Sequence, residues 1–330
     1  MIPRNVTQVL IQFTFLSGLC SPAAAADSSA EILQEGTMLY SPDRRSGMRL
    51  ITIAALPNIT VGGFKVAELS GLAWDADEGI LYAVSDNGYL LHLQPVIRND
   101  VLEDVLLLAG YSLRDDNDRA LRGKSADSEG LAAVKSNNGI SGDTELLISF
   151  ERRPRIARYT PAGKWLETLP LPPAWSDISP YRSENRSLES LVMHGELGLI
   201  IGSEYPLNDS ETGVLSLFSI TGNEWRIPAH NKNDGALVGM TLMEDGAILA
   251  LERAYGGLFP GIETTLHRIV LDQAQHRSQV LITLRPGDVI FNENFEGITH
   301  HEADRYFMIS DDNNHPLKRT LLVYFSLFME

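Results

Sequence analysis

Cysteine and basic residues are scarce in this sequence. A single cysteine, Cys20, excludes a disulfide framework, thiolate zinc clusters and CxxC redox chemistry. Lysine and arginine number 27 against 43 aspartates and glutamates, which gives a net charge of −16. A chain this acidic does not attract a polyanion. We therefore expect no nucleic-acid partner, and we favour a cation as the ligand.

The N-terminal segment, residues 1–26, has the features of a secretory signal peptide. It carries one positive charge at Arg4, an apolar run over residues 9–19 and small residues at 24–26. A lipoprotein signal ending at Cys20 is disfavoured, because a leucine precedes the cysteine. We expect cleavage after residue 26 and a periplasmic or secreted protein. No later run reaches the roughly 18 to 20 apolar residues of a membrane-spanning helix, so we expect no membrane span.

A small residue followed by an apolar one recurs five times along the chain. The five pairs are Gly71-Leu72, Gly130-Leu131, Ser190-Leu191, Gly239-Met240 and Gly297-Ile298. Their small residues are 59, 60, 49 and 58 positions apart. Each pair is followed by a polar turn and a second apolar run, as in a β-hairpin, and several of these turns contain a glycine that can adopt positive φ.

Each unit continues with a third apolar run, and several units have a fourth. Four antiparallel strands per unit are typical of a propeller blade. We predict an all-β protein, a β-propeller of five or six four-stranded blades forming one domain over residues 48–330, after an extension over residues 27–47. A sixth blade stays open because spacings near 60 exceed the usual blade length of about 40 to 50 residues. Residues 48–56 are predicted to supply the outer strand of the last blade and close the ring.

Acidic residues recur at two positions of this repeat. In an antiparallel blade the first strand starts at the end of the sheet where the second strand finishes, because the chain goes out and returns. The acids that end the second strands are Asp86, Glu151, Glu204, Glu252 and Asp311. The acids that start the first strands are Glu129, Glu189 and Glu296. We expect these eight carboxylates to converge at one mouth of the central channel.

Carboxylates gathered at one mouth repel one another unless a positive group lies among them. Carboxylate oxygens suit hard cations, and calcium accepts irregular shells of roughly six to eight oxygens. The sequence therefore predicts a calcium site with these eight acids as metal ligands. A structural alternative stays open, in which each acid pairs with a neighbouring arginine, since Arg152, Arg153 and Arg253 directly follow two of the acids.

The same arginines indicate a small anionic phosphoester as the substrate. Guanidinium groups bind phosphate oxygens in a bidentate manner, and a metal ion can bridge a phosphate to carboxylates that would otherwise repel it. We interpret Glu129, Glu296, Arg152 and Arg253 as catalytic residues. The sequence lacks the Gly-x-Ser-x-Gly elbow, the P-loop and the His-Glu-x-x-His helix. Water activated by a metal is therefore the predicted nucleophile.

Short strings around the acids follow one another in a fixed order. They are Leu69–Trp74 with Leu81–Gly88, Asp127–Ala132 with Ser149–Arg152, Asn185–Leu191, and Phe295–Ile298 with Ile309–Asn313. Over roughly residues 48–328 the chain resembles the phytase-like family, described as having esterase-like activity of phytase. The resemblance implies a propeller related to calcium-dependent β-propeller phytases, which hydrolyse phosphomonoesters through water held among calcium ions. It also implies a set of site residues: Asp86, Glu129, Glu151, Glu189, Glu296, Asp311 and Asp312.

Two functions of different classes fit these features. The first is a secreted phytase-like hydrolase that cleaves phosphate esters with calcium-activated water. The second is a non-catalytic periplasmic propeller whose acidic mouth binds a cation or a basic partner, since propellers serve as binding platforms as well as enzymes.

Overall fold

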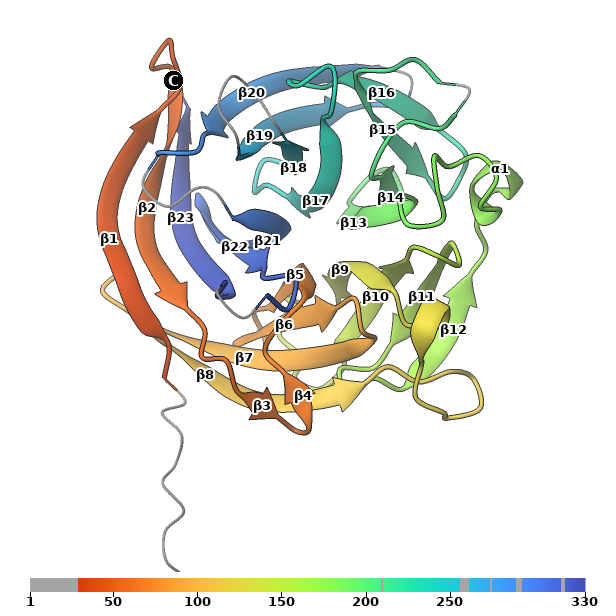
Figure 1. Ribbon diagram of the computed structural model, residues 1–330, viewed down its shortest axis with the longest axis horizontal. Coiled ribbons are helices and arrows are strands. Elements are labelled where there is room, and N and C mark those ends of the chain that lie inside the picture. The colour runs from red at the N-terminus through yellow and green to blue at the C-terminus, as the bar shows by residue number, and fades with distance from the viewer. Residues whose placement is uncertain are drawn as a thin grey trace, which may run out of the picture.

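Short apolar runs separated by turns pair into antiparallel sheets, because a strand satisfies its backbone hydrogen bonds only against a neighbour. Five such sheets surround a common axis as the blades of a propeller (Figure 1). The computed structural model describes residues 29–208, 210–255, 261–273, 275–288, 293–315 and 318–329. The predicted signal peptide lies outside the described residues.

The first four blades each consist of four antiparallel strands that follow one another from the axis outward. Blade 1 contains β5 (Leu69–Asp75), β6 (Ile80–Ser85), β7 (Tyr89–Arg98) and β8 (Val101–Ser112). Blade 2 contains β9 (Ser128–Val134), β10 (Glu145–Phe150), β11 (Arg155–Tyr159) and β12 (Trp165–Leu169). Blade 3 contains β13 (Leu188–His194), β14 (Gly198–Ser203), β15 (Val214–Ser219) and β16 (Glu224–Pro228). Blade 4 contains β17 (Ala236–Leu242), β18 (Ile248–Tyr255), β19 (Ile262–Leu271) and β20 (His276–Leu284).

The fifth blade joins the two ends of the described chain and closes the ring. Its inner strands are β21 (Asn294–Glu302), β22 (Arg305–Asp311) and β23 (Leu321–Met329). β2 (Ser46–Ala55) pairs antiparallel with β23, and β1 (Glu31–Tyr40) adds a fifth strand at the outer edge. The predicted closing strand is confirmed, and the ring has five blades rather than six. The strand β1 was not expected, because its segment carries no part of the repeat.

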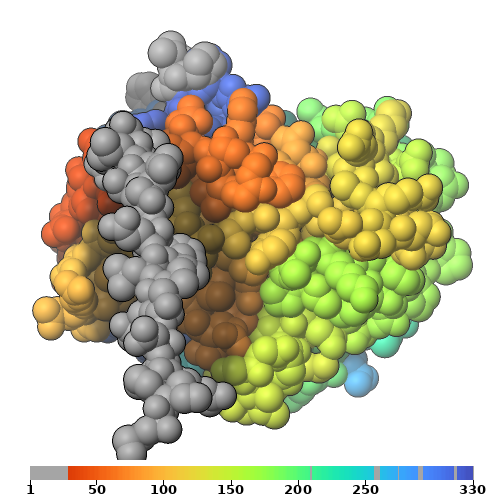
Figure 2. Space-filling model, turned by 90° about the horizontal axis from the view of Figure 1, so that it is seen from below, coloured from red at the N-terminus to blue at the C-terminus, as the bar shows by residue number. Residues whose placement is uncertain are grey.

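The remaining elements are short. A small hairpin, β3 (Thr60–Val61) and β4 (Phe64–Lys65), lies between the closing strand and blade 1. Among the described residues, helix is confined to α1 (Pro173–Ser176) and one 3-10 turn over Gly123–Ser125, and no helix there is long and apolar enough to cross a bilayer. Figure 2 shows residues of blades 1 and 2, orange to green, side by side on one face. The all-β prediction is confirmed.

The small residue of each repeat lies near the axis, where neighbouring inner strands make close contact. A Cβ atom on Gly71 would lie 2.4 Å from the backbone oxygen of Glu129 in blade 2. A Cβ atom on Gly239 would lie 2.4 Å from the backbone oxygen of Glu296 in blade 5. A side chain has almost no room at these positions, which explains why the repeat keeps a small residue. The apolar residue that follows, such as Leu72, is buried in a core layer shared with the preceding blade.

Apolar side chains fill the layers between neighbouring blades. Tyr82 and Val84 of blade 1 pack in one cluster with Leu131 and Phe150 of blade 2, and all four are buried. Burial of a large apolar side chain contributes about 1.5 to 3 kcal/mol. Each blade therefore stabilises its neighbour, and the ring holds the ends of the strands in fixed positions around the channel.

We expect Gly239→Ala to lower the free energy of unfolding by about 1 to 3 kcal/mol, because the added methyl group overpacks the contact between β17 and β21. Denaturant unfolding followed by tryptophan fluorescence measures this change. Gly195→Ala is the matched control, since an added Cβ in that turn has no atom within 4 Å. Its effect should stay within about 0.5 kcal/mol. Equal effects of the two substitutions would contradict the packing argument.

Candidate functional site

A polar cavity of ≈ 210 Å³ lies at one mouth of the central channel, and all five blades contribute to its lining. Seven of its side chains are carboxylates: Asp86, Glu129, Glu151, Glu189, Glu204, Glu296 and Asp311. The structure therefore brings together seven of the eight acids expected at this mouth. The other lining residues are Ser70, Asn185, Arg253, Tyr255, Asn294 and Asn313.

An irregularity near the start of every inner strand aims side chains at this cavity. At that point each inner strand has one residue more than its partner strand, which is a β-bulge. A bulge turns a side chain out of the regular alternation of a strand. The extra residue is Glu189 in β13 and Glu296 in β21, and the bulge of β9 includes Glu129. The extra residues in blades 1 and 4, Ser70 and Val238, carry no charge.

The second strands supply the other four carboxylates of the cavity. β6, β10 and β14 each end one residue before an acid, and β22 ends on one: Asp86, Glu151, Glu204 and Asp311. Backbone groups orient two of them. The N–H of Ser187 donates to Glu151 Oε1 at 3.1 Å, and the N–H of Asn313 donates to Asp311 Oδ1 at 2.7 Å. These acids are therefore fixed by the loops that join the strands.

In blade 4, Arg253 takes the place that Glu252 was expected to hold. In blades 1, 3 and 5, a serine of the second strand pairs with the residue that lies two positions before the small residue of the repeat. The acid directly follows this serine. In blade 4 the residue at that paired position is Glu252, opposite Leu237, so Arg253 corresponds to Asp86 of blade 1. A shift of one residue moves a side chain to the opposite face of a strand. Glu252 is therefore not among the residues that line the mouth.

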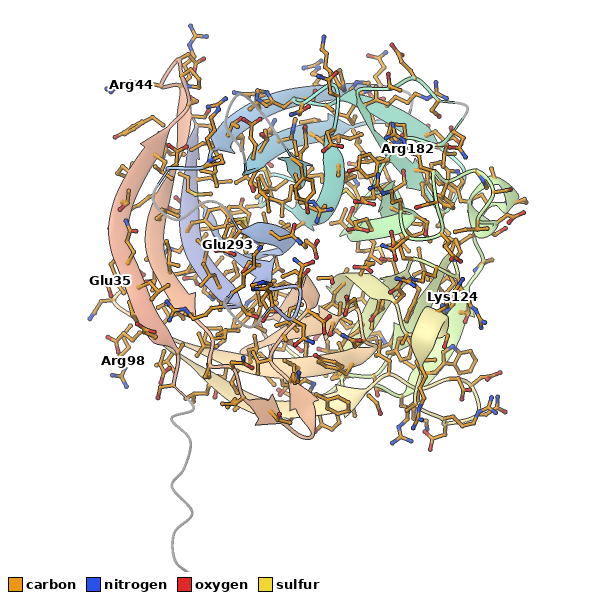
Figure 3. All side chains as sticks on the ribbon, viewed as in Figure 1. Glu35, Arg44, Arg98, Lys124, Arg182 and Glu293 are labelled. Carbon is orange, nitrogen blue, oxygen red and sulfur yellow. The ribbon has the colours of Figure 1, made fainter. Side chains whose placement is uncertain are left out.

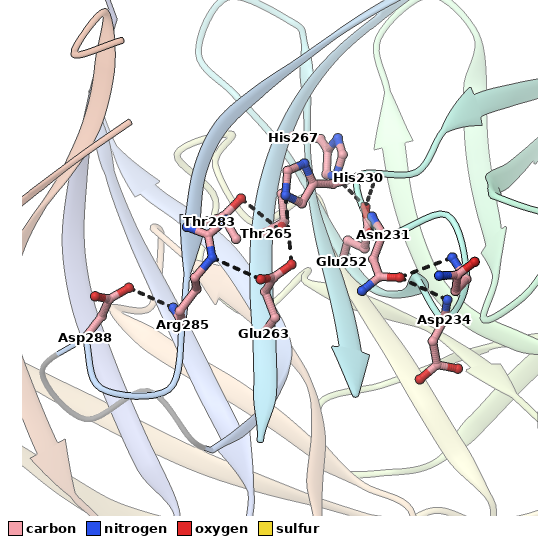
Figure 4. A network of polar contacts seen from close by, with 11 residues as sticks. His230, Asn231, Asp234, Glu252, Glu263, Thr265, His267, Thr283, Arg285 and Asp288 are labelled. Carbon is pink, nitrogen blue, oxygen red and sulfur yellow. Dashed lines mark hydrogen bonds and ion pairs between the residues drawn. The ribbon is translucent and has the colours of Figure 1, made fainter. Parts of the chain in front are cut away.

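Glu252 instead belongs to a buried network inside blade 4 (Figure 4). Its Oε2 lies 2.6 Å from Nε2 of His267, and both side chains are 1% exposed. The backbone N–H groups of His230 and Asn231 each donate to the same carboxylate at 2.8 Å. With three partners already in place, Glu252 has a structural role.

Asp312 and Arg152 also lie outside the cavity lining. Asp312 Oδ1 accepts hydrogen bonds from the N–H groups of Glu68 at 3.1 Å and Asn314 at 2.9 Å, which ties blade 5 to blade 1. Arg152 Nε donates to Asp127 Oδ2 at 2.8 Å, and the arginine side chain is 39% exposed. Asp312 is thus occupied by backbone donors, and Arg152 by a carboxylate beside the cavity.

Arg253 is the one basic side chain among the described residues that line the cavity. Its guanidinium is buried and donates to Glu204 Oε1 at 2.9 Å and also to Glu296 Oε1. The same group donates to Asn294 Oδ1 at 2.8 Å. The structural alternative, in which each acid has its own arginine, therefore accounts for two of the seven carboxylates.

Two buried acids of the cavity, Glu129 and Glu189, form no hydrogen bond or ion pair with a described residue. They are 8% and 6% exposed. Burial raises the pKa of both well above the usual range, and repulsion raises it further, chiefly from Glu151 at Glu129 and from Glu129 at Glu189. Buried polar groups normally have a partner. Their carboxylates could therefore bind a cation.

Burial also raises the pKa of four other acids that face the cavity, Asp86, Glu151, Glu204 and Asp311, and repulsion from neighbouring carboxylates adds to it. The pKa of Glu151 rises to about 9, with Glu204 as the strongest repelling neighbour. That of Asp86 rises to about 8, and those of Glu204 and Asp311 to about 7. Arg253 opposes the rise at Glu204. Without a bound cation, several of these groups hold protons at neutral pH.

Two sets of three carboxylates are close enough to share a cation. Asp127, Glu129 and Glu151 form one set, and Glu151, Glu189 and Glu204 form the other; within each set the ligand oxygens lie within 4.8 Å of one another. Glu151 belongs to both sets, so the cavity offers two adjacent positions with a shared ligand. Donor sets made of carboxylate oxygens alone fit a hard cation such as calcium.

Sequence reasoning did not assign roles to Asp127 and Asn294, which lie three residues before the small residue of the repeat in blades 2 and 5. Blade 3 has Ser187 at that position, and its N–H orients Glu151. Aligning the five repeats on their small residues would have shown a polar residue there in four of the five, with Ala236 in blade 4 as the exception. Tyr255 was also missed, because β18 runs beyond the length of the other second strands.

Comparison with known proteins gives a family match. The family model described as "Phytase-like: Esterase-like activity of phytase" matches residues 65–314. This stretch contains the inner strand of every blade and all the residues that line the cavity. A search of curated proteins gave no match.

We expect the melting temperature of the calcium-free protein to fall as the pH rises from about 5 to about 9. Six of the cavity acids, all but Glu296, have a higher pKa in the folded chain than in the unfolded chain, where Asp and Glu titrate near 3.8 and 4.5. In this window the folded state binds more protons, so stability is lost as the pH increases. Glu151→Gln removes one of these groups and should raise the melting temperature at pH 8 without calcium.

The control for this prediction is Glu35→Gln, which removes one charge at the outer edge of the ring (Figure 3). It should leave the slope of melting temperature against pH unchanged. Millimolar calcium should stabilise the wild type at pH 8 more than Glu151→Gln, because a cation binds the ionised carboxylate. A lower melting temperature of Glu151→Gln than of the wild type at pH 8 without calcium would contradict the argument.

Proposed function

Because the chain belongs to the phytase-like family, we propose that its acidic cavity binds calcium and hydrolyses phosphate monoesters. The observation that carries this proposal is the pair of buried, unpartnered carboxylates, Glu129 and Glu189, in two ligand sets joined by Glu151. A carboxylate cavity repels a phosphate group unless cations offset its charge. Phosphate esters and calcium therefore belong to one functional site.

The carboxylates of the two sets would hold the cations, with Glu151 as the bridging ligand and Asp127 and Glu204 at the two ends. Bound calcium supplies positive charge for the phosphoryl oxygens and lowers the pKa of an attacking water. Glu129 and Glu296 face the cavity and would orient this water and accept its proton. The water oxygen would bond to phosphorus as the bond between phosphorus and the ester oxygen breaks, and the leaving alkoxide would take up the proton that the glutamate received from the water.

Arg253 would contact a phosphoryl oxygen from the blade 4 side of the cavity. Glu204, Glu296 and Asn294 fix its guanidinium, so it is oriented before a substrate arrives. A guanidinium suits a phosphate because its planar donors match the oxygens. Arg152, the other arginine predicted to be catalytic, does not line the cavity, and its side chain is paired with Asp127.

The proposed location is the periplasm or the exterior of the cell. It rests on the N-terminal sequence, where Arg4, the apolar run and the small residues at 24–26 form a signal-peptide pattern. Sites that use calcium outside the cytoplasm often bind it with dissociation constants of about 0.1 to 1 mM. We therefore propose calcium of the surrounding medium as the source of the bound ions.

The same geometry supports a second candidate, a non-catalytic propeller that binds a cation or a basic partner. The specific observation is Arg253 itself, since a buried guanidinium between Glu204 and Glu296 shows how a basic group fits between cavity acids. In this case calcium stabilises the protein without turnover. The two candidates share a ligand site and differ only in hydrolysis.

The purified protein should release phosphate from phosphomonoesters in calcium and lose this activity in a chelator. The double variant Glu129→Gln, Glu296→Gln should lower kcat at least about 100-fold, because it removes both the proton acceptor and part of the charge that holds the cations. Phosphate release under saturating substrate measures kcat, and calcium titration by calorimetry shows whether the ions still bind.

Glu196→Gln is the matched control, because Glu196 is exposed in the β13–β14 turn and does not line the cavity. It should retain full activity. No hydrolysis above the blank, with either calcium or chelator and across several phosphomonoesters, would end the catalytic proposal. If hydrolysis is absent but calcium raises the melting temperature, the result would favour the non-catalytic binding protein. If calcium also leaves the melting temperature unchanged, the result would count against both candidates.

A further inference from the structure

A groove of ≈ 370 Å³ lies between blades 4 and 5, separate from the acidic cavity. It is formed by the β17–β18 turn, the β21–β22 turn and the end of β23. These turns lie at the ends of the sheets opposite to the cavity, because the first and second strands of a blade are joined there. The proposed hydrolysis leaves this groove without a role.

One part of the groove wall is apolar. Met243 and Leu327 are buried beside it, and Met329 is 42% exposed at its edge. The ring of Tyr306 lines it as well and stacks on Phe325, with 5.6 Å between the ring centroids. This surface suits the apolar body of a small ligand.

Tyr306 brings a polar atom without a partner into the groove. The residue is 1% exposed, and its phenol forms no hydrogen bond with any described residue. A tyrosine whose ring is packed in a core usually directs its hydroxyl to a hydrogen-bond partner or to the solvent side of the core. Because the side chain lines the groove, a ligand seated there can reach the oxygen.

Carboxylates surround this phenol. Glu244 and Asp304 lie in the two turns, are exposed, and form no ion pair with a described residue, whereas Asp245 is paired with Arg268. Burial, and then the charges of Asp245, Asp304 and Glu244, raise the pKa of Tyr306. The phenol therefore stays protonated and neutral, and its oxygen can accept a hydrogen bond.

We propose that this groove binds a small organic ammonium ion with an apolar body. The body lies against Met243, Leu327 and Met329, and the ammonium group donates to the Tyr306 oxygen and is attracted by Glu244 and Asp304. An anion is repelled by the two acids. A neutral apolar molecule leaves the phenol without a partner. The occupant is a free primary amine of about the size of hexylamine.

The test is a titration of the full mature protein with hexylammonium chloride, followed through the methyl signals of carbon-13-labelled methionine. Calcium is present throughout, and sodium chloride keeps the ionic strength constant. Met243 and Met329, assigned by Met→Leu variants, should shift in a saturable manner at millimolar ligand. Met193 lines the mouth of the central channel that is opposite to the acidic cavity, outside the groove, and its signal should not shift. 1-Hexanol and sodium hexanoate should bind at least about 5-fold more weakly.

Variants at the surface keep the test independent of folding. Glu244→Gln and Asp304→Asn should each weaken hexylammonium binding about 2- to 5-fold, as for exposed charge pairs. Tyr306→Phe keeps the ring against Phe325 and should weaken it about 3- to 10-fold. Glu196→Gln, in the equivalent turn of blade 3, is the matched control and should bind as the wild type does.

Several results would overturn the proposal. The first is equal affinity of the protein for 1-hexanol and hexylammonium, and the second is wild-type affinity for hexylammonium in both Glu244→Gln and Asp304→Asn. The others are a shift of the Met193 signal alone and no shift of any methionine signal at millimolar hexylammonium. The acidic cavity is not involved in this test, so hydrolytic activity of the variants should equal that of the wild type.

Discussion

Close contact between the backbones of neighbouring inner strands determines the shape of the channel. At Gly71, Gly130, Gly239 and Gly297, an added Cβ would lie within 3.0 Å of a neighbouring atom. With only a glycine or a serine at this position, the five inner strands approach one axis, and the residues beside each small residue come together. The bulge next to this contact then turns Glu129, Glu189 and Glu296 toward the cavity.

This convergence has an electrostatic cost that connects stability to function. Seven carboxylates face one cavity, and the single positive charge of Arg253 is shared between two of them. In the absence of a cation the chain limits the cost by keeping protons, as the raised pKa values of Asp86 and Glu151 show. In the proposed function, a cation that replaces these protons would stabilise the fold and at the same time provide a charge for an anionic substrate. The repulsion between the carboxylates would then be the source of the affinity for the cation.

The sequence predicted the fold well and the site only in part, for reasons that particular residues show. Hairpin turns and a recurring small residue are local signals, and they were sufficient for the propeller of four-stranded blades and its closing strand, although they left five and six blades open. The prediction placed Glu252 at the mouth because this acid follows an apolar run, as the acids of the other blades do. The pairing register instead makes Arg253 the residue equivalent to those acids. Asp312 was misplaced because its carboxylate accepts hydrogen bonds from Glu68 and Thr320, and Glu68 is far away in the chain.

The amino-acid sequence by itself determined that the chain is an all-β repeat protein with acids recurring at fixed places, since strand alternation and turn chemistry act between near neighbours. Only the tertiary structure decided which acids share a cavity and which are bound elsewhere. A side chain's direction depends on the register and bulges of strands paired within a blade, and its partners depend on the adjacent blade. Those contacts join residues tens of positions apart, so no local pattern reports them.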